Sequence, residues 1–139
     1  MPVKWKHGDE FSMCYCTFSC YKWLHLFKIV DGYDMVYERF DVLKKDGYKV
    51  VGYVIMPNHL HVMIYFSKPA YNLNKIIGNG KRFMAYEIIK RLEAMKRNDL
   101  LEYLFDPIQF LSFRKPVGDI VKNLLFFRFI MNFMIKSIP

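Results

Sequence analysis

The chain of 139 residues has the length of one domain with a single core, and a hydrophobic content of 53% with 18% aromatic residues excludes an intrinsically disordered protein. Lys and Arg outnumber Asp and Glu by 21 to 13. The net charge of +8 favours a polyanionic partner, although ribosomal or membrane-surface binding fits the same charge. We expect residues 1–139 to form one domain.

The first segments of the chain are a basic arm and a β-rich stretch. Residues 1–10 are basic and have no apolar period, which indicates a loose arm. Residues 11–29 are rich in aromatic residues and predict a first strand, with a second short strand after it as an option. Asp31-Gly32 then predicts a turn.

Three cysteines cluster in the first predicted strand with the spacing C-x-C-x-x-x-C: Cys14, Cys16 and Cys20. Their odd number and the lack of a signal-peptide pattern argue against a secreted disulfide scaffold. In an extended segment they share one face, so a soft-metal site is an alternative, although the spacing fits no common zinc pattern. We favour reduced, buried thiols, which indicates a cytoplasmic protein.

A helix and a strand are predicted next. Asp34 is a suitable N-cap for a helix that runs to about Lys45, since apolar residues recur between them at helical spacing. Asp46-Gly47 predicts the end of this helix, because Gly adopts the left-handed conformation that commonly follows one. Residues 48–56 then predict a second strand.

Residues 52–66 predict two strands joined by a tight turn at Pro57-Asn58, since Pro presets φ and Asn tolerates the left-handed region. The second strand alternates between a face with Leu60, Val62, Ile64 and Phe66 and a face with His59, His61, Met63 and Tyr65. The two imidazoles therefore project side by side, as two ligands of one divalent cation would. From spacing alone, a pair of exposed or hydrogen-bonded histidines is the alternative.

After a loop at residues 67–71, Asn72 is a suitable cap for a long helix. Its apolar stripe follows the i, i+3, i+4 rule and contains Leu73, Ile76, Ile77, Gly80, Met84 and Ile88. The opposite side contains Lys75, Arg82, Tyr86, Lys90 and Glu93. Tyr86 is about 140° from the apolar centre, so we expect it to emerge among cations. Gly78 and Gly80 indicate either a kink or a place where a DNA backbone comes close.

The order strand, helix, strand, strand, helix predicts an α+β domain with a ferredoxin-like antiparallel sheet, helices on one face and the histidines on the open face. Residues 105–139 are a divergent tail. Its apolar run at residues 124–135 is too short and too polar for a membrane span. The run fits a buried helix, a dimer surface or the product of a frameshift.

The sequence Met56-Pro57-Asn58-His59-Leu60-His61 resembles the signature of the HUH single-strand transposases. The resembled branch is that of the REP-associated, IS200-like single-tyrosine transposases. The resemblance extends over residues 45–95 and fails beyond about residue 105. It implies a ferredoxin-like sheet with the HUH motif on its central strand, and single-stranded DNA lying on the open face. It also implies a homodimer with composite active sites.

The resemblance implies a DNA strand-transferase that binds single-stranded or hairpin DNA in the bacterial cytoplasm, in association with the nucleoid. His59 and His61 would hold Mg²⁺ or Mn²⁺, with a polar side chain or water as a further ligand. A tyrosine downstream of the histidines would attack the phosphate and form a phosphotyrosine. We predict Tyr86, flanked by Arg82 and Lys90, as this nucleophile. Tyr103 is the second candidate, and a chain that lacks the nucleophile is the alternative.

The predicted DNA contacts are Asn58, Lys75, Lys81, Arg82 and Lys90, with a solvated basic helix face as the alternative for the cations. Tyr65 and Tyr71 are candidates for stacking on unpaired bases. Two other functions fit the same residues. One is a catalytically dead, truncated transposase remnant that only binds DNA, and the other is a small basic RNA-binding module with incidental histidines.

Overall fold

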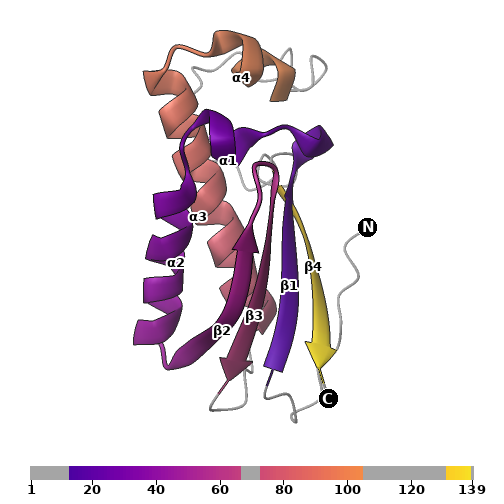
Figure 1. Ribbon diagram of the computed structural model, residues 1–139. Coiled ribbons are helices and arrows are strands. Elements are labelled where there is room, and N and C mark those ends of the chain that lie inside the picture. Colours follow the sequence, from indigo (N-terminus) through magenta and orange to yellow (C-terminus); the bar gives the residue numbers. More distant parts are fainter. Residues whose placement is uncertain (1–12, 67–72, 105–130, 139) are drawn as a thin grey trace.

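The computed structural model describes residues 13–66, 73–104 and 131–138 (Figure 1). Its elements are β1 (Met13–Cys20), the 3-10 helix η1 (Tyr21–Trp23), α1 (Leu26–Ile29), α2 (Tyr33–Lys45), β2 (Tyr48–Ile55), β3 (His59–Phe66), α3 (Leu73–Ala94), α4 (Asn98–Leu104) and β4 (Met131–Ile138). The strands form one antiparallel sheet in the order β2-β3-β1-β4. This order, with helices between β1 and β2 and after β3, is ferredoxin-like. The predicted fold class and the central position of the histidine strand are confirmed.

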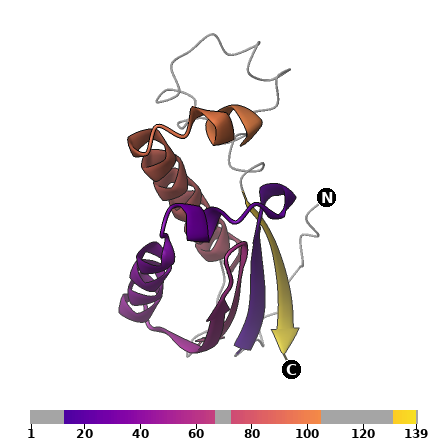
Figure 2. The ribbon, with the colours of Figure 1, turned by 45° about the horizontal axis from the view of Figure 1, so that its top comes forward.

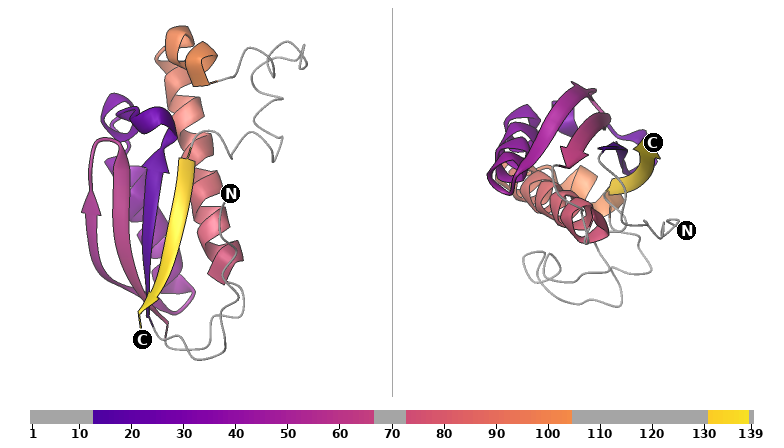
Figure 3. Two further views of the ribbon diagram at one scale, coloured as in Figure 1. Left: turned by 90° about the vertical axis from the view of Figure 1, so that its right-hand side faces the viewer. Right: turned by 90° about the horizontal axis from the view of Figure 1, so that it is seen from below.

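The helices α2 and α3 cover one face of the sheet, as the turned views in Figures 2 and 3 show. Along β1 and β3, alternate residues are buried against these helices, because successive side chains of a strand point to opposite faces. Leu60, Val62 and Ile64 of β3 line the same internal space as Ile77 and Met84 of α3. Each of these side chains stabilises the fold by roughly 1.5–3 kcal/mol through burial. The core therefore lies wholly on the helix side of β3.

The cysteine prediction is confirmed for β1. Cys14, Cys16 and Cys20 are buried on the helix-covered face and form no disulfide. Burial raises the pKa of the Cys20 thiol to about 12 and keeps it protonated. No cluster of three or more His, Cys, Asp or Glu side chains in residues 13–66 and 75–104 could hold a metal ion. These thiols therefore act as small core residues.

The prediction of a second strand before residue 29 is wrong, because this segment is helical. The backbone turns at η1 and continues as α1, in which Leu26 and Phe27 are buried. The Phe27 amide donates a hydrogen bond to the Pro57 carbonyl at 3.1 Å. Docking of this segment onto the β2–β3 turn thus outweighs its aromatic β-propensity.

The helix predicted from Asp34 to about Lys45 is confirmed as α2, but the capping prediction is wrong. Gly32 is the N-cap, and Asp34 lies in the first turn. Its carboxylate accepts two hydrogen bonds from Arg91 of α3, at 2.7 and 2.8 Å, which lowers the pKa of Asp34. Gly47 has a φ of 89°, as expected for a glycine that follows a helix.

The long helix predicted after residue 72 is confirmed as α3, which continues through both glycines. Its buried positions are Ile77, Met84, Ala85, Ile88, Ile89 and Leu92. Lys75, Lys90 and Glu93 are exposed as predicted. Tyr86 is not, since it is half-buried and packs against the core. The short helix α4, with Leu101 and Leu104 buried, was not predicted.

Part of the predicted tail completes the sheet. Residues 131–138 form the edge strand β4, which pairs with β1 from Met13↔Ile138 to Cys20↔Met131. The predicted alternative of a buried helix at residues 124–135 is therefore wrong from Met131 onward. A continuous apolar run has no periodicity that would distinguish a helix from a strand. Residues 1–10, 67–72 and the rest of that run lie outside the described residues. None of the described helices has the length and hydropathy of a membrane span.

Candidate metal and nucleic-acid site

The β2–β3 hairpin places His59 and His61 on the face of the sheet that the helices leave open. The Met56 amide donates to the His59 carbonyl at 2.7 Å and closes the turn at Pro57 and Asn58. Both imidazoles are half-buried, while Leu60 between them points into the core. The ring centroids lie 4.8 Å apart, and the ring planes are at 78°. The predicted side-by-side arrangement of the two histidines is confirmed.

Two hydroxyl groups of β1 fix the imidazole of His61. The Tyr15 hydroxyl lies 2.7 Å and Thr17 Oγ1 lies 2.9 Å from His61 Nδ1. Thr17 is the residue directly opposite His61 in the β1–β3 register, and the Tyr15 ring stacks on the imidazole at 5.6 Å. Both contacts use Nδ1, and Nε2 has no hydrogen-bond partner among residues 13–66 and 75–104.

An amide side chain fixes the imidazole of His59. Asn58 Oδ1 lies 2.7 Å from His59 Nδ1. Because an amide oxygen only accepts hydrogen bonds, the Nδ1 proton of His59 donates to it, and the lone pair of neutral His59 is on Nε2. Partial burial, and secondarily the nearby His61, lower the pKa of His59. The neutral imidazole, which is the metal-binding form, is therefore favoured.

The two histidines fit a divalent cation. Hydrogen bonds to the ring nitrogen that does not bind the metal are typical of metal-ligating histidines, because they set the tautomer and the ring orientation. Here side chains engage both Nδ1 atoms, and within the described segments neither Nε2 atom has a hydrogen-bond partner. The Asn58 oxygen sets the tautomer of His59, whereas the two hydroxyls orient the His61 ring. Mg²⁺ and Mn²⁺ both favour oxygen ligands, which water and phosphate would supply beside the two imidazoles. The other coordination positions would need water or a phosphate oxygen, since no third His, Cys, Asp or Glu joins the pair within the described segments.

The structure separates the two tyrosines that were predicted as nucleophile candidates. Tyr86 packs against the core from α3, so the sheet lies between it and the histidines of the same chain. Tyr103 is 51% exposed on α4, which lies beyond α1 at the same end of the molecule as the β2–β3 turn (Figure 1). Lys22 Nζ lies 4.8 Å from the centre of the Tyr103 ring. We call the end of the sheet that carries the β2–β3 turn, His59 and His61 the histidine end. Of the two tyrosines, Tyr103 lies at this end.

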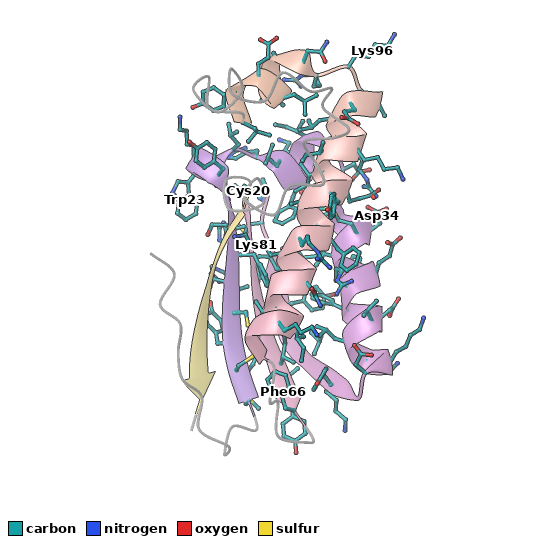
Figure 4. All side chains as sticks on the ribbon, turned by 180° about the vertical axis from the view of Figure 1, so that it is seen from behind. Cys20, Trp23, Asp34, Phe66, Lys81 and Lys96 are labelled. Atoms are coloured by element: carbon teal, nitrogen blue, oxygen red, sulfur yellow. The ribbon has the colours of Figure 1, made fainter. Side chains whose placement is uncertain are left out.

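The predicted DNA contacts also fall into two groups. Asn58 lies beside the histidines and bonds to His59. Lys75, Lys81, Arg82 and Lys90 all belong to α3 and therefore to the helix side; Figure 4 shows Lys81 on this helix. Of these four, Lys75 and Lys90 are exposed, whereas Lys81 and Arg82 are half-buried. The structure does not bring these cations to the histidine face.

Sequence reasoning missed Tyr15, Thr17 and Trp23. Tyr15 and Thr17 alternate with the three cysteines along β1, so the period-two pattern that buries the thiols also points these hydroxyls to the opposite face. That pattern could have identified them once β1 was placed beside β3. Trp23 lies edge-on to His59 with a centroid distance of 5.8 Å. Of the tyrosines predicted to stack on bases, Tyr65 is half-buried on the histidine face, and Tyr71 lies outside the described residues.

The family model described as "Transposase IS200 like" matches residues 34–112, which is more than half of the chain. No curated protein matches the chain. Among solved structures, the chain is similar to a crystal structure from Deinococcus radiodurans that is provisionally assigned as a transposase. The TM-score is 0.48 at 14% identity, over 99% of this chain and 87% of that chain.

Proposed function

This chain belongs to the IS200-like transposase family, and from that premise we propose that it cleaves and rejoins single-stranded or hairpin DNA on the histidine face. The observation that carries the proposal is the state of the two imidazoles. His59 and His61 lie on one open face, each with Nδ1 engaged and Nε2 left for a ligand. An incidental pair of surface histidines would not need three polar side chains to orient it.

His59 and His61 would hold a divalent cation, Mn²⁺ or Mg²⁺, through their Nε2 atoms. When bound, such a cation polarises a phosphate and neutralises the charge that develops during cleavage. Tyr15, Thr17 and Asn58 would keep both rings in the ligating orientation. The lowered pKa of His59 would favour the neutral form of this ring.

A tyrosine would supply the nucleophile. Its phenolic oxygen would give up its proton and form a bond to phosphorus while the bond to one deoxyribose oxygen breaks, and the freed oxygen would take up a proton. Attack by a free DNA hydroxyl on the phosphotyrosine would rejoin the strand without another energy source. Within one chain Tyr103 is the candidate, because it is exposed at the histidine end. Tyr86 would require a homodimer in which the α3 helix of one copy reaches the histidines of the other.

The proposal is tested by covalent trapping. The full chain is incubated with a labelled single-stranded hairpin oligonucleotide and Mn²⁺, denatured and separated by size, and the linked residue is mapped by mass spectrometry. We expect a protein–DNA adduct that Tyr103→Phe abolishes if the attack is within one chain, or that Tyr86→Phe abolishes if the site is shared. Tyr53→Phe is the matched control, since Tyr53 is exposed on β2, outside the proposed site.

The position of Tyr86 favours one second candidate function, that of a DNA-binding remnant. If neither Tyr86 nor Tyr103 reaches a phosphate at the histidines, the protein would bind DNA without cutting it. Absence of both adduct and nicking with Mn²⁺, together with retained binding of the same oligonucleotide, would contradict the catalytic proposal and support the remnant.

A further inference from the structure

The turn after β1 holds an exposed tryptophan in an unusual backbone conformation. Lys22 and Trp23 are consecutive residues with left-handed φ values of 48° and 57°. Residues other than glycine rarely adopt this region, because the Cβ atom approaches the following carbonyl oxygen. Such strain persists only where the surrounding structure imposes it, and it is concentrated at functional sites.

Asn58 ties this turn to the candidate metal site. Its side-chain amide donates a hydrogen bond to the Trp23 carbonyl at 3.4 Å, while its Oδ1 contacts His59 Nδ1 at 2.7 Å. Its backbone carbonyl accepts a hydrogen bond from the Cys20 amide at 2.9 Å. One residue therefore positions both Trp23 and His59, whose rings lie nearly perpendicular at 80°.

The indole of Trp23 is 62% exposed, and Figure 4 shows it projecting outward at the end of the sheet. Neither the strained backbone nor the exposed indole stabilises the isolated protein, since burial of so large an apolar ring would favour folding. Lys22, next to it, is also exposed and adds a positive charge. An exposed aromatic ring beside a cation is the combination that binds an unpaired nucleotide.

We propose that Trp23 is a stacking platform for one unpaired nucleobase of the DNA strand that lies at His59 and His61. This inference rests on the proposed function, which identifies the ligand as single-stranded DNA. It adds Trp23 to the site as a residue that holds the DNA strand in place. Because every base has a π-face, the contact would tolerate any base sequence. Trp23 would therefore contribute affinity and position, and not sequence preference.

The test uses the fluorescence of Trp23 itself. The chain has two tryptophans, so Trp5→Phe leaves Trp23 as the only one in an otherwise complete protein. Without metal, oligothymidylate is titrated into this variant, and an oligonucleotide of the same length made only of abasic units serves as the matched probe. We expect quenching of Trp23 fluorescence by the thymidylate and little quenching by the abasic strand at saturation. No quenching at saturation, or equal quenching by both probes, would overturn the inference.

Substitutions give the second measurement. Base–aromatic stacking predicts that Trp23→Ala weakens binding of oligothymidylate roughly 5- to 150-fold, with most of the affinity kept by Trp23→Phe. Phe83→Ala is the control, because Phe83 is also exposed, at 48%, but lies on α3. Equal affinity of Trp23→Ala and the unaltered chain, or an equal loss in Phe83→Ala, would contradict stacking at this turn. Circular dichroism confirms that each variant is folded.

The outcome separates this inference from the proposed function, because binding is measured without metal and nicking is assayed independently. Quenching with no nicking under any condition would contradict the nuclease proposal alone. Nicking together with an unquenched Trp23 would contradict the stacking platform alone.

Discussion

The side chains of β3 have different surroundings on the two faces of the sheet, the helix-covered face and the histidine face. On the first face Leu60 is only 2% exposed and packs in a continuous apolar core. On the second face His59 and His61 are half-buried, with His61 contacting two hydroxyl groups of β1 and His59 contacting the side chain of the adjacent Asn58. Stability is concentrated on one side of the strand, which leaves the other side available for ligand-binding groups.

The two tyrosines downstream of the histidines, Tyr86 and Tyr103, differ in the same way as the two faces. Tyr86 belongs to the stabilising side, where it packs against the core. Tyr103 is exposed near Lys22 and the turn that carries Trp23. If the contrast between the faces is correct, substitutions on the helix side should change the free energy of unfolding, and substitutions on the histidine side should change metal binding and cleavage.

The largest expected effect is that of removing both imidazoles. The double substitution His59→Ala and His61→Ala should lower the rate of Mn²⁺-dependent nicking by about a thousandfold or more, since a bound cation supplies several kcal/mol of charge stabilisation. Affinity for the same single-stranded oligonucleotide should change by less than about threefold, because most of that affinity comes from other charges and rings. A gel-based nicking assay with a parallel binding titration measures both. Undiminished nicking in the double variant would remove the catalytic role of the histidines.

A pair of substitutions along β3 compares the two faces directly. Leu60→Ala should lower the free energy of unfolding by about 2–5 kcal/mol, because it leaves a cavity in the core. Met63→Ala, at a half-buried position on the histidine face, should cost less than about 1.5 kcal/mol. Urea unfolding of both variants gives the comparison. Equal losses in the two variants would show that the histidine face also carries a core.

Loss of the hydroxyls that orient His61 should have a smaller effect on chemistry. The double substitution Tyr15→Phe and Thr17→Val should weaken Mn²⁺ binding by about 10- to 100-fold, because His61 is then no longer held in the ligating orientation. Calorimetric titration with Mn²⁺ measures the change. Tyr65→Phe is the control on the same face of β3. If the control loses as much affinity as the double variant, orientation by β1 is not the cause.

The smallest expected effect is a pH dependence carried by His59. Burial lowers the pKa of His59 below its ordinary value of 6.5, so the folded protein binds fewer protons here than the unfolded chain. The resulting stabilisation is complete above pH 6.5 and is lost as pH falls through the lower folded pKa. His59→Asn should therefore flatten the decline of the free energy of unfolding below pH 6.5. An unchanged slope in this variant would assign the decline to other groups.

Local patterns in the sequence predict the sheet and the histidine pair well. The alternation along residues 59–66 places His59 and His61 on one face and Leu60 on the other, because the side-chain period of a strand leaves no other choice. The Pro57-Asn58 turn and the end of α2 at Asp46-Gly47 are equally local.

Features that depend on contacts between distant segments could not be predicted in the same way. Asp34 has the residue type of an N-cap, yet Arg91, far along the chain, binds its carboxylate. The helical angle alone predicts an exposed Tyr86, whereas its packing against the core leaves it half-buried. The hydroxyls at Tyr15 and Thr17 reach His61 only through the β1–β3 pairing, which the sequence of β3 does not contain.

The central claim is that His59 and His61 together bind one divalent cation on the open face. Electron paramagnetic resonance during titration of Mn²⁺ into the full chain tests it most directly, because the signal reports both the stoichiometry and coupling to nitrogen ligands. We expect one Mn²⁺ per chain with nitrogen coupling, and loss of that site when both histidines are replaced by alanine. Equal binding of Mn²⁺ by the unaltered chain and the double variant, or no binding by the unaltered chain, would contradict it.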